Sequence, residues 1–257
     1  MKVGLLHPGA MGAAMGAALV GNGHDVLWSS AGRSDATRGR ADAGGLVDVE
    51  SLDALAARSE IVISICPPEH AAEVAGAVRA TGFAGLFVDA NAVSPDTVKA
   101  IAPDVDGGVI GGPPRAAGTT RLYLSGHEAA RVAALFDGSV LDARVLDDQI
   151  GTASALKMTY AAYTKGLSAM LIALRETARA NGVDQYLLEE WAISQPDLTA
   201  ISEVSAAHAG PKAWRWVAEM EEIASTFAAA GQPDGFHLAA AAVFRQVAAA
   251  HAEASPQ

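Results

Sequence analysis

Lys157 is the residue of this sequence best suited to moving a proton. It lies in the run Ala155-Leu156-Lys157-Met158, near the start of a long helical pattern, where apolar neighbours would exclude water from its ammonium group. Desolvation lowers the pKa of a lysine amine toward neutral pH, and an amine that titrates there can act as a general acid or base. The competing interpretation is a lysine at a helix end whose stem covers apolar surface while its ammonium group reaches water.

Nearby side chains on the same helical pattern could assist Lys157. At 3.6 residues per turn, Thr164 and Ser168 share roughly the face of Lys157, with Tyr160 to one side and Lys165 to the other. Tyr160 is therefore a second candidate proton donor, and Lys165 is a candidate anchor for an anionic substrate. An aromatic side chain in such a helix is more often part of the core.

Another group of polar and aromatic side chains lies near the C-terminus. The segment 212–222 concentrates charge and aromatic area, and His237 follows Gly235-Phe236 at the start of the next helical pattern. Trp214, Arg215 and His237 are the candidates for substrate contact in this part of the chain. The same cluster could instead form a salt-bridged seam between two domains.

The composition indicates a small-molecule partner. The formal net charge is −11 without an acidic tail or a basic block, which argues against binding to nucleic acid or to a membrane surface. The single cysteine, Cys66, excludes an intramolecular disulfide and favours a cytoplasmic protein, and the seven histidines show no spacing typical of metal ligands. We see no run of about 18 apolar residues and no secretory leader, so we expect no membrane span.

The order of the apolar patterns predicts the scaffold that positions these residues. Short β-rich apolar runs alternate with alanine-rich helical patterns, which is typical of a doubly wound parallel sheet, the Rossmann architecture. The expected strands lie at 3–6, 25–28, 61–65, 86–88, 105–110, 121–124 and 144–146.

The pattern changes after Gly151, where we find no further strand. One helical pattern runs from Ser154 to about Ala180 and ends at Asn181-Gly182, a pair typical of a helix C-terminus. We therefore predict an α/β domain over residues 1–150 and a smaller all-helical domain over residues 151–257, joined by a long interdomain helix.

The first strand leads into a glycine-rich turn that is typical of dinucleotide binding. The second and third glycines of the pattern Gly-x-Gly-x-x-Gly correspond to Gly9 and Gly12, at the start of a helix whose N–H groups and dipole favour a phosphate. His7 stands in place of the first glycine, so we expect His7 and Pro8 to form the turn with ordinary φ angles. The alternative is a helix start that packs on the strand without a ligand.

The end of the second strand indicates which dinucleotide binds. Enzymes that use NAD usually offer an acidic residue there to the ribose 2′-hydroxyl, and this chain has none. Ser30, Arg33 and Ser34 instead offer hydroxyls and a guanidinium group suited to a 2′-phosphate. We therefore predict NADP(H) rather than NAD, although arginines here could also form a solvated loop.

Taken in order, the motifs resemble those of the β-hydroxyacid dehydrogenase superfamily, which includes the NADP-binding domain of 6-phosphogluconate dehydrogenase and the imine reductases. The resemblance rests on Gly9-Ala10-Met11-Gly12, Cys66-Pro67-Pro68, the segment 89–95 around Asn91, and the helix start 151–157. It implies that residues 1–150 bind the dinucleotide through Gly9, Ala10, Met11, Gly12, Cys66, Pro67, Pro68 and Asn91. It further implies that Lys157 is the catalytic lysine, with Asn91 beside the nicotinamide or the substrate, and that the chain forms a homodimer through its C-terminal helices.

Two departures from this family bear on the substrate. Ile110 precedes Gly111-Gly112 where hydroxyacid dehydrogenases carry a serine that holds the substrate carboxylate, and Ala161 occupies the position of a family asparagine. A simple 3-hydroxy acid is therefore a poor fit, and we expect hydride transfer between a nicotinamide and a small polar carbonyl or alcohol. An imine reductase is the nearest alternative, and an NADPH-binding sensor without turnover is an alternative from another class.

Overall fold

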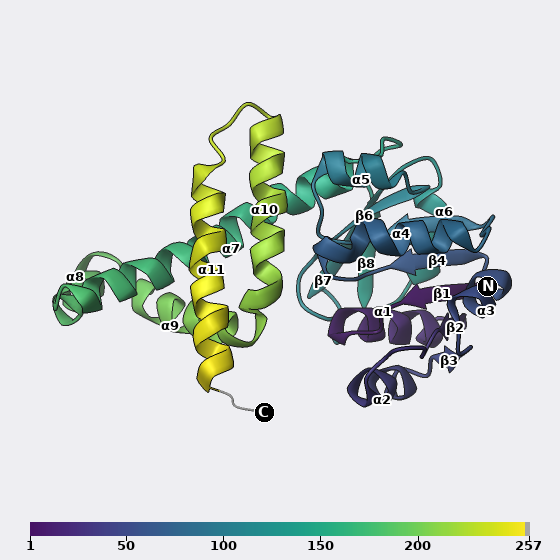
Figure 1. Ribbon diagram of the computed structural model, residues 1–257, viewed down its shortest axis with the longest axis horizontal. Helices are drawn as coiled ribbons and strands as arrows, with labels where there is room; N and C mark the ends of the chain where they lie inside the picture. The colour runs from purple at the N-terminus through teal and green to yellow at the C-terminus, as the bar shows by residue number, and fades with distance from the viewer. Residues whose placement is uncertain (255–257) are drawn as a thin grey trace. The chain divides into compact units, whose positions relative to one another are not determined.

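The computed structural model describes residues 1–254 and divides the chain into two compact units (Figure 1). Unit 1 comprises Met1–Met158, and unit 2 begins at Thr159. The division falls within helix α7 (Thr152–Ala180), whereas the sequence predicts a boundary at residue 150, ahead of this helix. The first turns of α7 are therefore part of the α/β unit.

Unit 1 is built on an eight-stranded sheet with the strand order β3-β2-β1-β4-β5-β6-β7-β8. All neighbouring strands are parallel except β6 and β7, which pair antiparallel. The strand order reverses direction between β1 and β4, and ligands of doubly wound sheets bind at the carboxyl ends of the strands at this switch point. The strands are β1 (Lys2–Leu6), β2 (Asp25–Trp28), β3 (Val47–Asp48), β4 (Ile61–Ser64), β5 (Leu86–Asp89), β6 (Val105–Ile110), β7 (Thr120–Ser125) and β8 (Leu141–Val145).

Helices cover both faces of this sheet, which explains why its inner strands are apolar at nearly every position. Alternate residues of one strand enter different cores: Ile61 and Ile63 belong to one buried cluster, and Val62 belongs to the other. The first cluster includes side chains of α1 and α6, and the second includes side chains of α3, α4 and α5. The helices are α1 (Ala10–Gly21), α2 (Asp35–Ala43), α3 (Leu52–Arg58), η1 (Pro68–His70), α4 (Ala71–Ala80), α5 (Pro95–Ile101), α6 (Ala129–Ala133) and η2 (Ala134–Phe136).

Unit 2 contains only helices among its described residues, as the sequence predicts. After α7 come α8 (Asp184–Ser194), α9 (Leu198–Ala209), η3 (Gly210–Lys212), α10 (Ala213–Ala229) and α11 (Gly235–Ala254). Helices α10 and α11 run side by side (Figure 1), with the rings of Trp216 and Phe244 5.1 Å apart in an edge-to-face contact.

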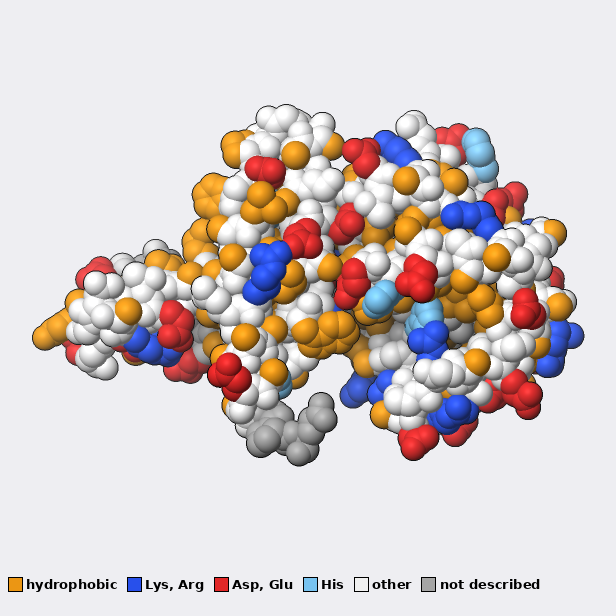
Figure 2. Space-filling model, viewed as in Figure 1, with side chains coloured by type: hydrophobic (Ala, Val, Ile, Leu, Met, Phe, Trp, Pro, Cys, Tyr) orange, Lys and Arg blue, Asp and Glu red, His pale blue; other side chains and the backbone are white. Residues whose placement is uncertain are grey.

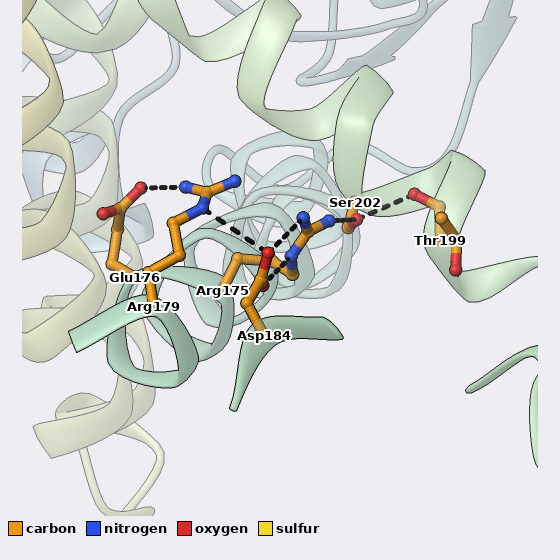
Figure 3. A network of polar contacts seen from close by, with 6 residues as sticks. All are labelled: Arg175, Glu176, Arg179, Asp184, Thr199 and Ser202. Carbon is orange, nitrogen blue, oxygen red and sulfur yellow. Dashed lines mark hydrogen bonds and ion pairs between the residues drawn. The ribbon is translucent and has the colours of Figure 1, made fainter. Parts of the chain in front are cut away.

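A polar network ties α7 to α8 and α9 within unit 2 (Figure 3). Arg175 donates two hydrogen bonds to the Asp184 carboxylate, at 2.6 and 3.0 Å, and a third to the Ser202 hydroxyl at 3.2 Å. The hydrogen bond from the Arg175 guanidinium lowers the pKa of Asp184, whose carboxylate also lies at the positive start of α8. The network thus fixes the position of α9 relative to α7.

Candidate functional site

The turn between β1 and α1 has the geometry of a phosphate-binding turn, although it lacks the first glycine. His7 adopts a left-handed conformation with φ 65°, so the expectation of ordinary φ angles is wrong. This conformation costs a residue other than glycine about 1–2 kcal/mol. A Cβ added to Gly12 would lie 2.8 Å from the His7 carbonyl oxygen and 3.0 Å from Ile65, so only glycine fits there. Gly9 is the N-cap of α1, and no side chain caps it.

The imidazole of His7 lies in a cationic environment. Its Nδ1 is buried without a hydrogen-bond partner in the part of the chain that the structure describes. Burial, with smaller contributions from the charges of Arg33 and His70, lowers the pKa of His7 to about 4. Figure 2 shows histidine side chains with a basic side chain and acidic side chains close to them over the region of α1 and α4. His7 is therefore neutral near pH 7, and the groups around it favour an anion.

The loop after β2 places the predicted 2′-phosphate residues at the start of α2. Ser34 caps α2 by accepting a hydrogen bond from the Thr37 N–H, and Ser30 is buried, with its N–H donated to Asp48 at 3.1 Å. Arg33 is exposed, and within residues 1–254 its guanidinium makes no hydrogen bond or ion pair. The loop thus leaves one guanidinium available for an anionic group.

Two other arginines of this region have structural roles instead. Arg38 donates to the Ser30 carbonyl at 3.0 Å and lies 3.9 Å from the Asp48 carboxylate. Arg40 donates to the Pro8 carbonyl at 3.3 Å and therefore braces the turn after β1.

Asn91 connects the loops that follow β4 and β5. Its amide nitrogen donates to Ser64 at 3.1 Å and to Asp89 at 2.8 Å, and its Oδ1 accepts the Cys66 N–H at 2.6 Å. The side chain is only 2% exposed, so Asn91 holds the Cys66-Pro67-Pro68 loop in position at the carboxyl edge of the sheet. Burial raises the pKa of Asp89 to about 7 and the pKa of the Cys66 thiol to about 12. The thiol is therefore not a nucleophile near neutral pH.

The first turn of α7 is held to the sheet by a buried carboxylate. Asp106 of β6 accepts hydrogen bonds from the Gly151 and Ser154 N–H groups, both at 3.0 Å, and from the Ser154 hydroxyl at 2.7 Å. It also accepts the Ser125 hydroxyl at 3.2 Å, and the residue is fully buried. A carboxylate at the positive end of a helix is stabilising, so Asp106 determines where α7 begins.

Lys157 lies over a glycine of the sheet. A Cβ added to Gly108 of β6 would lie 2.9 Å from the Lys157 Cβ and 2.7 Å from the Ala153 carbonyl oxygen. Glycine at position 108 therefore allows α7 to approach β6 closely, and this approach places the half-buried Lys157 beside the sheet. Tyr160 follows on the same helix, in unit 2, with 45% of its surface exposed.

Unit 2 has a pocket of its own, with a volume of about 420 Å³, among α7, α9 and α10. Lys165 is the cation of this pocket; it pairs with the buried Glu219 at 2.6 Å and lies 5.7 Å from the centre of the Trp216 ring. Ile201 and Val204 contribute apolar surface that is partly exposed. The lining residues are Thr164, Lys165, Ser168, Ala200, Ile201, Val204, Ser205, His208 and Trp216.

The other predicted substrate residues do not line this pocket. Trp214 and Arg215 are exposed at the start of α10. His237 is buried against Phe227, with the two ring centres 4.2 Å apart, and burial lowers its pKa. Trp216 lines the pocket instead of Trp214, because α10 turns that face toward α7 and α9.

Sequence reasoning overlooked the buried polar groups that hold the site together, above all Ser64, Asp89 and Asp106. A signal for Asp106 was available: it is the only charged residue in a strand whose six residues are all buried. An acidic residue in such a strand needs buried partners. Among the described residues, no group of histidine, cysteine and acidic side chains could hold a metal ion, and no helix is long and apolar enough to cross a membrane.

Two family models match parts of this chain. The model described as "NADP oxidoreductase coenzyme F420-dependent" matches residues 2–93, which include the turn after β1 and the loops after β2 and β4. A domain of unknown function, DUF1932, matches residues 178–247 in unit 2. An uncharacterized 28.5 kDa protein of Methanothermus fervidus is 33% identical over 164 residues; the match covers 62% of this chain and 63% of that protein.

Solved structures with the same fold cover nearly the whole chain. A conserved protein of unknown function, described as similar to 3-hydroxyacid dehydrogenases, has a TM-score of 0.68 and 26% identity, with all of both chains covered. The 3-hydroxyisobutyrate dehydrogenase of Mycobacterium tuberculosis, solved with L-serine, has a TM-score of 0.71 and 19% identity over 98% of this chain and 94% of that one. An imine reductase of Streptomyces aurantiacus has a TM-score of 0.55 and 21% identity, and the match covers 98% of this chain and 96% of that one.

The chain therefore has the fold of the hydroxyacid dehydrogenases and imine reductases, as its motifs predict.

Proposed function

We propose that this protein is an NADP(H)-dependent oxidoreductase that acts on a small polar carbonyl or alcohol. The observation that carries the proposal is the turn between β1 and α1, with its left-handed His7 and its Gly12 that has no room for a Cβ. It lies at the switch point of the sheet, where this architecture binds ligands.

The residues of unit 1 fit the two charged parts of NADP(H). The N–H groups of Ala10 and Met11 at the uncapped start of α1 would hold the pyrophosphate. Gly9, whose own N–H donates to the His7 carbonyl, would leave room for it because it has no side chain. The exposed Arg33, flanked by Ser30 and Ser34, would hold the 2′-phosphate. The loop that Asn91 positions, Cys66-Pro67-Pro68, would border the nicotinamide, which when bound supplies or accepts the hydride.

Lys157 would then be the proton-transfer residue. In reduction its ammonium group donates a proton to the carbonyl oxygen as that oxygen gains negative charge, and in oxidation the neutral amine accepts the hydroxyl proton. Its support from β6 is rigid, because Gly108 allows close packing and Asp106 fixes the helix start. Tyr160, one turn of α7 away in sequence, is the alternative proton donor.

Within unit 2, the pocket around Lys165 is our candidate for contact with a substrate. Lys165 and Trp216 offer a cation and an aromatic face, and Ile201 and Val204 offer apolar contacts. Trp214 and Arg215, exposed on α10, and the buried His237 remain weaker candidates for this role.

The test is a binding and turnover experiment with the full chain. NADPH binding would be followed by its fluorescence, and turnover by the loss of NADPH absorbance with a panel of aldehydes, ketones and imines, and by its gain with the matching alcohols and amines. Binding together with turnover of a carbonyl supports the proposal. Binding without turnover of any compound favours the sensor alternative, and no binding overturns the proposal.

An imine reductase is the second candidate function. Ile110 and Ala161 occupy positions where the family uses polar groups to anchor substrate, and both are buried and apolar, with 4% and 1% exposure. A substrate without a carboxylate needs no such anchors, which favours an imine. Faster turnover of cyclic imines than of any carbonyl in the panel would select this alternative.

We also propose that the protein is a homodimer that pairs through unit 2. Large apolar side chains are exposed on its helices (Figure 2), among them Tyr163 (70%), Tyr186 (70%), Ile193 (80%) and Phe236 (71%). So many large exposed apolar side chains in one small unit favour a protein interface there.

A further inference from the structure

His7 combines two features that packing alone does not require. It occupies the place of a glycine in a conformation unfavourable to a side chain, with φ 65°. Backbone strain of this kind is concentrated at functional sites, where surrounding structure holds it in place. The turn is indeed braced: Arg40 binds the Pro8 carbonyl at 3.3 Å, and the Gly9 N–H donates to the His7 carbonyl at 2.7 Å.

The second feature is an unused ring nitrogen. Nδ1 of His7 is buried and has no hydrogen-bond partner among residues 1–254. An unpaired buried polar atom is unfavourable, and native proteins rarely keep one without a ligand, a water or a functional reason. Because this nitrogen is buried, a ligand atom can form a hydrogen bond with it only after the imidazole ring turns toward the ligand.

We propose that His7 is a ligand of the dinucleotide pyrophosphate and that its imidazole takes up a proton when the dinucleotide binds. The inference rests on the proposed NADP(H) site and adds a role to the residue that departs from the glycine pattern. An imidazolium donates a charge-assisted hydrogen bond to a phosphate oxygen, which a glycine at this position cannot do.

The charged groups around His7 determine the direction of this coupling. Arg33 from the loop after β2 and His70 from η1 act on the imidazole, and burial together with their charges lowers the pKa of His7 to about 4. His70 itself lies 3.7 Å from the Glu73 carboxylate, and Arg40 contributes a further cation at the Pro8 carbonyl. The free protein therefore holds His7 neutral.

A bound pyrophosphate opposes these effects, because its negative charges offset the charge of Arg33 and favour a proton on the ring in spite of its burial. An opposite charge at this range raises the pKa of a histidine by about 1–3. If the pKa of His7 is about 6 in the complex, binding takes up well over half a proton at about pH 5.5. The dissociation constant is then about tenfold larger at pH 7 than at pH 5.

The experiment is isothermal titration calorimetry of the full chain with NADP⁺, which is stable in acid. Titrations at about pH 5.5 in two buffers of different ionisation enthalpy give the number of protons taken up. The wild type is compared with His7→Asn, because asparagine tolerates the left-handed conformation and does not titrate in this range. His127→Asn is the matched control, since the His127 side chain is 86% exposed on the same unit.

We expect the wild type and His127→Asn to take up at least about half a proton more on binding than His7→Asn does. The affinity of the wild type and of His127→Asn for the dinucleotide should fall between pH 5 and 7, whereas that of His7→Asn should not. Repeating the titration with NAD⁺ separates His7 from the 2′-phosphate, whose own second ionisation lies near about pH 6. Equal proton uptake by the wild type and His7→Asn with both dinucleotides overturns the inference while leaving the NADP(H) site intact. Absence of NADP⁺ binding by the wild type overturns the proposed function itself.

A second measurement keeps the inference testable if His7→Asn fails to fold. The His7 ring signal in the NMR spectrum of the wild type should titrate near pH 4 in the free protein and at least one pH unit higher with saturating NADP⁺. An unchanged titration overturns the proposal.

Discussion

Replacing Asp106 with leucine tests whether one buried carboxylate determines where the catalytic helix begins. Asp106 accepts two backbone N–H groups of α7, from Gly151 and Ser154, and the hydroxyls of Ser154 and Ser125. Leucine has a similar shape and leaves these donors without an acceptor. The hydroxyls can turn to other acceptors, but the two N–H groups cannot.

Each buried donor left unpaired costs about 1–3 kcal/mol, so the loss of the acceptor for two N–H groups should lower the unfolding free energy of the variant by about 2–6 kcal/mol. Asp106→Asn keeps one carbonyl oxygen for the two N–H groups and loses the charge, which is worth about 1–2 kcal/mol at a helix start. It also replaces the oxygen that accepts the Ser154 hydroxyl with an NH2 group, which that hydroxyl can turn to accept. Asp142→Asn is the control, because that carboxylate is 39% exposed and pairs with Arg144 at the surface. It should change stability by less than about 1 kcal/mol.

Urea unfolding of the three variants measures these differences, and hydrogen exchange of the segment 148–158 locates them. We expect faster exchange at Gly151 and Ser154 in Asp106→Leu, and impaired turnover, because α7 carries Lys157. If Asp106→Leu unfolds within about 1 kcal/mol of the wild type, Asp106 does not hold the helix and the reasoning is wrong.

The remaining predictions concern Lys157, Arg33, His7 and the assembly of the chain. Lys157→Met keeps the side-chain volume and removes the ammonium group, so NADPH binding should persist while turnover falls by about 10²–10⁴; turnover within a few-fold of the wild type would remove Lys157 from the mechanism. Arg33→Ala should reduce the preference for NADPH over NADH by about tenfold, whereas the exposed Arg131→Ala should not, as dissociation constants would show. The folded-state pKa of His7 is about 4, below the unfolded value of 6.5, so its contribution to stability is present above pH 6.5 and is lost as the pH falls to about 4. Between pH 7 and 4.5, the unfolding free energy of His7→Asn in urea should therefore rise by about 2 kcal/mol relative to that of the wild type. A difference between the two proteins that does not change with pH would contradict the burial of a neutral ring. Light scattering at micromolar concentration should give twice the chain mass of 26.1 kDa, and a monomer mass would rule out the proposed dimer.

Elements with a local signal could be predicted from the sequence. The alternation of short apolar runs and alanine-rich helices predicted the doubly wound sheet, because a strand covered by helices on both faces must be apolar. The two-residue β3 (Val47–Asp48) was missed, since both of its residues are exposed at the sheet edge and carry no apolar pattern. Strand β8 was expected at 144–146 and lies at Leu141–Val145, because its pairing with β7 rather than its own pattern decides its bounds.

The candidate site shows the same division. The glycine turn and the position of Lys157 at the start of a long helix were evident from the order of residues. The left-handed φ of His7 was not, because a histidine carries no local signal for that conformation and only the braced turn imposes it. The pairing of Lys165 with Glu219, which lie far apart in the sequence, likewise depended on how α7 and α10 pack.

The sequence by itself thus determined the kinds of element, their order and the residues able to bind a dinucleotide, because these properties follow from local periodicity and residue chemistry. Only the tertiary structure decided which polar groups are partners, such as Asp106 with the start of α7 and Asn91 with the loop after β4. It also decided that Trp216, and not Trp214, lines the pocket. The physical reason is that burial and hydrogen bonding depend on groups brought together from distant parts of the chain, and their energies are set by that arrangement.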